Sequence, residues 1–245
     1  NYDREKRRYL ILMESFASLL LLMDAMAHIF SGYPGVPGSV MVCISSFLVF
    51  LLSDVFLLCF HIYVCVYLFS KKERRTLKRV KAGYVIAAAG AAFVVISQFT
   101  HWYYYIDGDN CYHRASLYIM SILLPAAGLL IDLTLLFQYK KRVSRKLLFS
   151  MLSCVVLPAV AAAVQAFWYG MSLIEFSVGI SMIIMFIVTM TELNQEMYQL
   201  ISREGKIKER LEIATILNKC IAELISGEDE DAAILFHGVL LPKDT

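Results

Sequence analysis

The chain has 245 residues, of which 59% are apolar, and its formal net charge is +2. Its mean hydropathy is +0.63. A soluble domain is nearer half apolar and carries its apolar residues in stripes, so this composition excludes an ordinary soluble enzyme or binding domain. Here the apolar residues form long, repeated runs. That pattern predicts a helical protein that crosses the membrane several times.

Six runs are long enough to cross a bilayer, because about 20 residues at 1.5 Å rise cover its roughly 30 Å core. We expect spans at residues 10–30, 40–69, 84–106, 116–139, 147–169 and 171–190. The predicted fold class is all-α: a polytopic membrane protein with a six-helix transmembrane bundle. The bilayer itself is then the first partner of the chain.

Basic residues alternate between the loops. Segments 1–9, 71–81 and 140–146 are basic, whereas the other loops have almost no Lys or Arg, with Arg114 as the exception. Because basic loops stay on the cytoplasmic side, this alternation predicts that both termini are cytoplasmic. Contact with anionic lipid explains these loops adequately, so nucleic-acid binding is not expected.

The sixth span continues without proline into a charged segment that carries two interleaved seven-residue series, the a/d pattern of a coiled coil. The first series is Leu193, Leu200, Ile207, Ala214 and Ile221; the second is Met197, Glu204, Leu211, Asn218 and Ile225. We call these ten residues the seam. They predict a cytoplasmic coiled-coil helix and a parallel homodimer. The polar seam residues suit a helix that switches between packings, or simply an imperfect coiled coil.

We therefore expect three regions: a six-span domain at 1–192, a signalling helix at 193–226, and the start of a further domain or tail at 227–245. Polar residues of four spans lie at similar depth in the outer half of the predicted bundle. They are Asp24, His28, Gln98, His101, Gln165 and Glu175, with aromatic neighbours Trp102, Tyr105, Trp168 and Tyr169. Ionisable groups are costly in lipid and mark functional sites. The set predicts a cup that binds a small polar ligand from outside; alternatively, these groups pair with one another or reach the interface.

Other polar residues allow more than one interpretation. Asp54 and Asp132 form hydrogen bonds between helices or, alternatively, part of a proton path. Cys43 and Cys111 are either a disulfide or independent small residues. The six cysteines form no CxxC pair or Cys/His cluster, so neither a metal site nor a cofactor is predicted. No catalytic motif is present, and no catalytic residue is assigned.

Four stretches carry a family resemblance: ISSFLVFLLSD (44–54), ISQFTHWYYYIDGDNCYHR (96–114), LLPAAGLLIDLTLLFQYKKRVSRK (123–146) and ERLEIATILNKCIAELISGEDEDAAI (209–234). The chain resembles the N-terminal six-span sensor region of bacterial signalling proteins of the kind found in gut clostridia. The last stretch resembles the lead-in helix of a GAF-type domain. The resemblance implies a bacterial plasma-membrane location. It also implies an output module beyond residue 245: a GGDEF diguanylate cyclase, an EAL phosphodiesterase or a histidine kinase.

Together these observations predict the input module of a dimeric membrane receptor that passes a ligand or membrane signal through the sixth span to a cytoplasmic output domain. Whether the whole protein is an enzyme depends on that domain. A small transporter or channel with a cytoplasmic dimerisation helix is the alternative, and a membrane scaffold without a ligand is a third.

Overall fold

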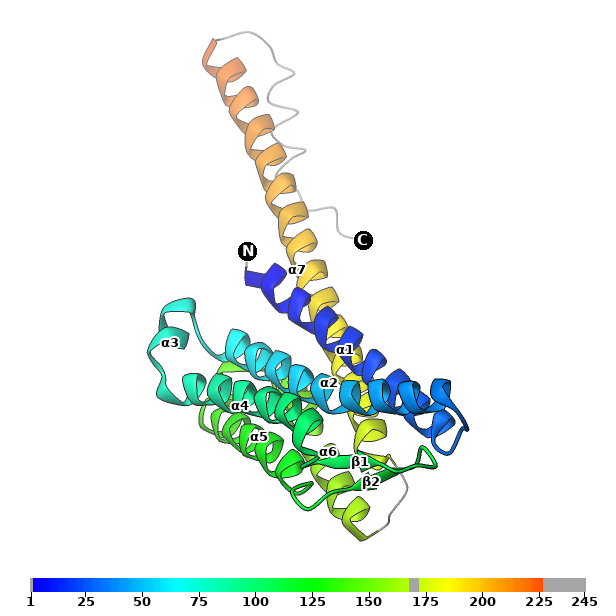
Figure 1. Cartoon of the computed structure of the whole chain (residues 1–245). Helices are drawn as coiled ribbons and strands as arrows, with labels where there is room; N and C mark the ends of the chain where they lie inside the picture. Colours follow the sequence, from blue (N-terminus) through cyan, green and yellow to red (C-terminus); the bar gives the residue numbers. More distant parts are fainter. Residues whose placement is uncertain (1, 168–171, 227–245) are drawn as a thin grey trace. The chain divides into compact units, whose positions relative to one another are not determined.

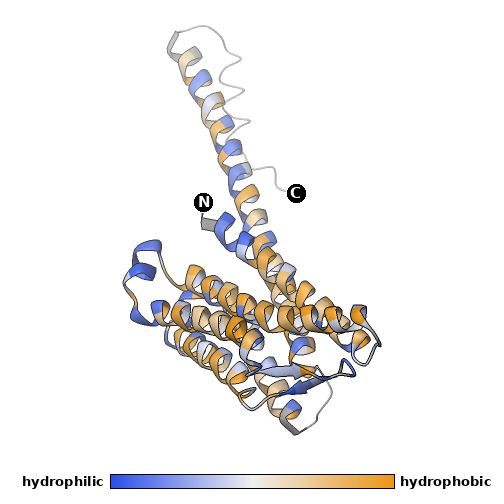
Figure 2. Ribbon diagram, in the orientation of Figure 1, coloured by the Kyte–Doolittle hydropathy of each residue, from blue (hydrophilic) through white to orange (hydrophobic). Residues whose placement is uncertain are grey.

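The computed structural model describes residues 2–167 and 172–226, and their side chains at 4–165 and 172–222. The chain divides into two compact units, 1–189 and 190–245, and each is described by itself. In the described part, six helices are long and apolar enough to cross a membrane. In Figure 2 the ribbon of these helices is coloured mostly as hydrophobic. The predicted class, an all-α polytopic membrane protein, is confirmed.

The six long helices are α1 (Tyr2–Phe30), α2 (Val36–Leu68), α4 (Lys78–Thr100), α5 (Met120–Gln138), α6 (Arg145–Phe167) and α7 (Leu173–Ser226), shown in Figure 1. The short elements are α3 (Lys71–Thr76), the 3-10 turn η1 (Lys140–Arg142) and the strands β1 (Tyr104–Ile106) and β2 (Tyr112–Arg114). Large apolar side chains point outward from the spans, for instance Phe99 at 84% exposed and Phe149 at 68%. Such a surface needs lipid around it.

The third span ends earlier than predicted. Helix α4 stops at Thr100, and His101 takes the left-handed conformation with φ 53°. The chain then forms an antiparallel hairpin in which Tyr104 lies opposite Arg114. The prediction that this span reaches residue 106 was wrong, because its aromatic residues pack sideways instead of continuing the helix. The ring of Tyr104 stacks on Phe50 of α2 at 5.4 Å between centroids.

The basic segments gather at one end of the 1–189 unit. Arg74 of α3 bonds both carboxylate oxygens of Glu5 on α1 at 3.2 Å. Arg142 of η1 donates to Glu73 at 3.1 Å. Ser70 caps α3, and its backbone N–H, with Arg142, holds the pKa of Glu73 below its usual value. The start of α1, the α2–α4 connection and the α5–α6 connection therefore meet, as alternating spans require.

The hairpin meets the α1–α2 loop at the other end of α1. The Gly32 backbone N–H donates to the Asn110 carbonyl at 3.1 Å, and the Asn110 amide donates to the Tyr33 carbonyl at 2.9 Å. Asp107 closes the hairpin turn by accepting from the Cys111 backbone N–H at 2.8 Å and pairing with His113 at 2.7 Å. These contacts hold the pKa of Asp107 below its usual value.

Helix α4 packs on α2 through small residues. Its buried positions recur at spacings of three and four: Val80, Gly83, Ala87, Gly90, Val94 and Ser97. A Cβ on Gly83 would meet the imidazole of His61, and a Cβ on Gly90 would lie 2.8 Å from Asp54 Oδ1. Two polar side chains of α2, two turns apart, thus fit against two glycines of α4 with the same spacing.

The interior of the bundle holds a buried polar pair. His61 Nδ1 lies 2.6 Å from Asp132 Oδ1, and the two side chains are 3% and 0% exposed. His61 Nε2 lies 3.0 Å from the carbonyl of Val80. The contact joins α2, α5 and α4, so Asp132 makes a hydrogen bond between helices. Cys43 and Cys111 are free thiols.

The first part of α7 packs inside the 1–189 unit. Ser181 Oγ donates to the Ser153 carbonyl of α6 at 3.1 Å, and Tyr63 OH of α2 lies 3.0 Å from Thr189 Oγ1. In the second unit, α7 continues as helix to Ser226. The seam residues from Met197 to Ile221 are exposed in the single chain, Leu200 at 58% and Leu211 at 67% among them.

Candidate functional site

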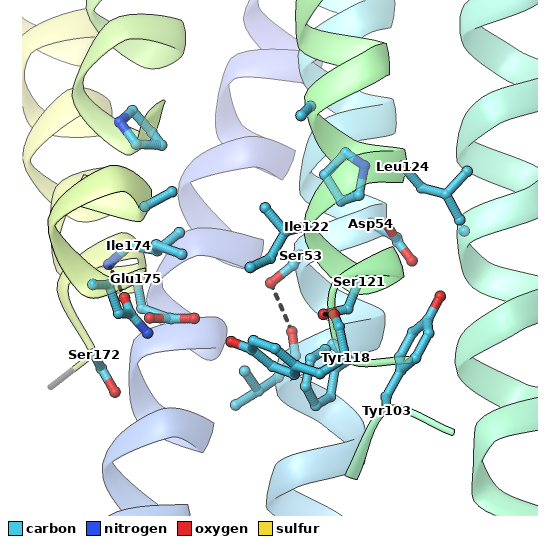
Figure 3. A pocket seen from close by; sticks show the side chains of 18 of the residues that line it. Ser53, Asp54, Tyr103, Tyr118, Ser121, Ile122, Leu124, Ser172, Ile174 and Glu175 are labelled. Carbon is cyan, nitrogen blue, oxygen red and sulfur yellow. Dashed lines mark hydrogen bonds between the residues drawn. The ribbon is translucent and has the colours of Figure 1, made fainter. Parts of the chain in front are cut away.

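A cavity of about 840 Å³ lies within the 1–189 unit, bordered by α1, α2, α4, α5, α6, the hairpin and the start of α7. Figure 3 shows it with Glu175 and Ser172 on one side and with Asp54 and Tyr103 on the other. Sites for small molecules measure roughly 300–1,000 Å³ and are mostly apolar, with a few polar groups. The cavity is therefore large enough to enclose such a ligand.

A chain of hydrogen bonds joins α1 to the residue before α7. Ser172 Oγ donates to Asp24 Oδ1 at 2.8 Å. His28 Nε2 lies 2.7 Å from the same hydroxyl and acts as its donor when the hydroxyl proton goes to Asp24. The imidazole and carboxylate are 3.8 Å apart, one helical turn along α1. The predicted proximity of Asp24 and His28 thus exists, and Ser172 completes it.

Glu175 lies in the first turn of α7 and borders the same cavity. Its Oε2 atom is buried and accepts no hydrogen bond from any residue that the structure describes. A buried polar atom without a partner costs free energy, about 1–3 kcal/mol and more when the group is charged. This side of the cavity therefore offers an acceptor with unused capacity for a donor or a cation.

Asp54 forms the opposite polar wall. It comes from the middle of α2, is only 6% exposed and lines the cavity beside Gly90 of α4. Its sequence position near the middle of a span gave no reason to include it in the cup. The spacing of Asp54 and His61, matched by that of Gly90 and Gly83, was the available signal that α2 places polar groups against α4.

The hairpin and the residues beside it add three tyrosines and an arginine to the cavity wall. They are Tyr103, Tyr112, Arg114 and Tyr118. Burial raises the pKa of Tyr103 to about 12, so its phenol keeps its proton and remains a possible donor at neutral pH. The Arg114 guanidinium lies 4.5 Å from the centroid of the Tyr118 ring, a cation–π contact. Sequence analysis missed these tyrosines because the hairpin itself was not predicted.

The remaining wall is apolar and comes from α5 and α6. Each of these helices has an internal proline at the cavity, Pro125 and Pro158. A proline inside a helix removes the hydrogen bond to the carbonyl four residues earlier and bends the helix. Both prolines lie in the cavity wall, so each helix lacks one backbone hydrogen bond there.

The predicted cup residues divide into three groups. Asp24, His28, Gln165 and Glu175 line the cavity together. Gln98, His101, Trp102 and Tyr105 do not: the Gln98 amide bonds the Tyr104 hydroxyl, His101 has left the helix, Trp102 is partly exposed, and Tyr105 stacks on His113. Trp168 and Tyr169 lie outside the described residues.

Gln165 also makes a hydrogen bond between two helices. Its Oε1 accepts a hydrogen bond from the Ile174 backbone N–H at 3.1 Å, which ties the end of α6 to the first turn of α7.

In the described part of the chain, no three His, Cys, Asp or Glu side chains are grouped as metal ligands. The polar groups that line the cavity include carboxylates, tyrosines, one imidazole and one guanidinium, and the rest of the lining is mainly apolar.

No protein-family model, curated protein or solved structure matches the chain. What is established is therefore the architecture, a multi-span membrane protein with six apolar helices.

Proposed function

We propose that the chain is the input module of a bacterial membrane receptor, in which a ligand in the cavity changes the state of α7. The observation that carries the proposal is the position of Glu175. It borders the cavity in the first turn of a helix that runs unbroken from Leu173 to Ser226. A change at the first turn of a continuous helix moves the rest of that helix, because its backbone hydrogen bonds resist local bending.

The second half of α7 is proposed to pair with a second copy. Seam residues Leu200, Ile207 and Leu211 are each 58% or more exposed in the single chain. Burial of such side chains favours association by roughly 1.5–3 kcal/mol each. The two copies are parallel, since both helices leave the same face of the membrane. The resemblance to clostridial signalling proteins supports an output in cyclic-di-GMP turnover or histidine-kinase phosphorylation, carried out beyond residue 245.

We propose that the chain lies in a bacterial plasma membrane with the basic end of the bundle on the cytoplasmic side. Both termini are then cytoplasmic. In a cysteine-free background, a cysteine at Ser39 should react with a membrane-impermeant maleimide in intact cells. A cysteine at Ser144 should react only after the membrane is opened. Labelling of Ser144→Cys from outside would reverse the assignment.

A small transporter or channel is the second candidate, because the buried Asp54 and Glu175 border one cavity and acidic residues within spans also mark ion pathways. The two functions differ in transport. Flux of protons or sodium ions through reconstituted vesicles, lost in Asp54→Asn, would favour the transporter. Ion permeability equal to that of protein-free vesicles would favour the receptor.

The receptor proposal predicts that Glu175→Gln alters the pairing of α7. Glutamine keeps the size of the side chain but replaces the acidic group with a neutral amide, and so changes the free energy of the empty state, by about 1–3 kcal/mol for a buried polar group without a partner. A shift of that size changes a two-state equilibrium at least fivefold. Disulfide cross-linking through Leu211→Cys in an otherwise cysteine-free chain measures it. Glu196→Gln, also on α7 but outside the cavity, is the control. Equal cross-linking in both variants would contradict coupling between cavity and helix.

A further inference from the structure

The cavity opens toward the apolar surface between α5 and α6. Three residues that line it are also strongly exposed: Leu130 of α5 at 60%, and Val156 and Val160 of α6 at 49% and 56%. Leu130 lies about 15 Å along the helix axis from Met120, at 1.5 Å per residue. The opening therefore lies at mid-span, where a membrane protein is surrounded by hydrocarbon chains and not by water.

The ionisable groups that border the cavity are mainly acidic. Asp24, Asp54 and Glu175 provide three carboxyl groups, against the guanidinium of Arg114 and the imidazole of His28. Arg114 already contacts Tyr118, and His28 is bonded to Ser172. The Oε2 atom of Glu175 accepts no hydrogen bond from the described residues. A cation close to this oxygen would give it an interaction partner. An anionic ligand would instead face acidic groups from α1, α2 and α7.

The walls suit both ends of an amphiphile. Three tyrosines line the cavity: Tyr103, Tyr112 and Tyr118. An ammonium group over a tyrosine ring gains about 0.5–2 kcal/mol. The α5–α6 wall contributes Leu129, Leu133, Val155 and several alanines, which bury an apolar chain at about 0.8 kcal/mol per CH₂. A volume of about 840 Å³ accommodates a head and a chain together.

From these three observations we infer that the cavity binds an amphiphilic cation, an ammonium group on a single apolar chain, which enters from the bilayer between α5 and α6. The inference rests on the proposed receptor function and specifies its ligand class and route. It also replaces entry from the outer aqueous side, which the sequence had led us to expect, with entry from the membrane.

The experiment uses the whole chain in dodecyl maltoside micelles and a dodecyltrimethylammonium probe that carries a diazirine on its chain. After illumination, mass spectrometry should place the label on peptides of α5 and α6. Unlabelled dodecyltrimethylammonium should compete. Choline, which lacks the chain, and dodecyl sulfate, which reverses the charge, should fail at the same concentrations. Lysophosphatidylethanolamine runs in parallel: competition by it as well assigns the natural ligand to a lipid headgroup, and failure assigns it to a free amine.

Glu175→Gln should raise the apparent dissociation constant for dodecyltrimethylammonium at least tenfold, while Glu196→Gln should leave it unchanged. Each variant must elute and melt as the wild-type chain does, and Asp24→Asn replaces Glu175→Gln if the latter unfolds. Label spread evenly over all spans, equal competition by dodecyl sulfate, or unchanged affinity in both cavity variants would overturn the ligand class. If the probe fails to bind but Glu175→Gln still changes the cross-linking at position 211, the receptor function stands and only the ligand class falls.

Discussion

His61→Leu should destabilise the bundle by about 3–5 kcal/mol, because it leaves Asp132 as a buried carboxyl with no partner. One oxygen of that carboxyl already lacks a hydrogen bond among the described residues. The Val80 carbonyl can only accept, so the proton on His61 Nε2 is fixed. One further proton lies between Nδ1 and Asp132. Wherever it resides, the pair is neutral overall, which suits the interior of a membrane protein.

Asp132→Asn is the matched conservative change, since its amide can donate to Nδ1 and keeps the site neutral. We expect it to cost about 1 kcal/mol, near the worth of one hydrogen bond. The double variant His61→Leu with Asp132→Leu should recover much of the stability, because apolar residues can replace a buried pair. Thermal unfolding in micelles, followed by size-exclusion elution, measures these three variants and Asp132→Leu, the second single variant that the coupling energy requires. A coupling energy near 0.6 kcal/mol, the average for membrane helix contacts, would show that the pair is an ordinary hydrogen bond.

Leu200→Lys should weaken dimers of the chain at least a hundredfold. Each copy would lose a buried leucine worth about 1.5–3 kcal/mol and would bring a charge against its partner's charge. A hundredfold change corresponds to about 2.7 kcal/mol, so the loss of two leucines is sufficient. The monomer–dimer equilibrium in micelles, measured by analytical ultracentrifugation, gives the dissociation constant.

Ile201→Lys is the control for this experiment. Ile201 is the next residue, is equally apolar and is 63% exposed, but it lies outside the seam. Cysteines at positions 200, 207 and 211 should cross-link between copies, and those at 203 and 209 should not. If Ile201→Lys weakens dimers as much as Leu200→Lys does, the seam is placed on the wrong face of α7.

The spans could be predicted from sequence because lipid imposes a simple rule of length and polarity. The six apolar runs and the long last helix appear where composition places them. The hairpin could not be predicted, because the run Trp102 to Tyr105 is apolar enough to continue a span. Two tertiary features favour strands over a longer helix: the stacking of Tyr104 on Phe50 and the turn that Asp107 closes.

The sequence predicted part of the candidate site, the part that depends on spacing along one helix. Asp24 and His28 share a helical face, which spacing alone gives. Gln98 and His101 also have the spacing of a shared face, yet His101 lies past the end of α4, so the face does not exist. Asp54 joins the cavity through the fit of α2 against Gly90, a contact between helices that a sequence pattern suggests but does not position.

The central claim is that occupation of the cavity changes the pairing of α7, and filling the cavity from within tests it most directly. Ala162 of α6 lines the cavity, whereas Val164, two residues on, is 42% exposed and does not. In Ala162→Trp the indole occupies the space of a ligand; Val164→Trp places the same group toward lipid. The measurement is the distance between spin labels at Leu211→Cys in the two copies, recorded in lipid nanodiscs. The account predicts a changed distance distribution in Ala162→Trp and the wild-type distribution in Val164→Trp. Identical distributions in two folded variants would contradict it.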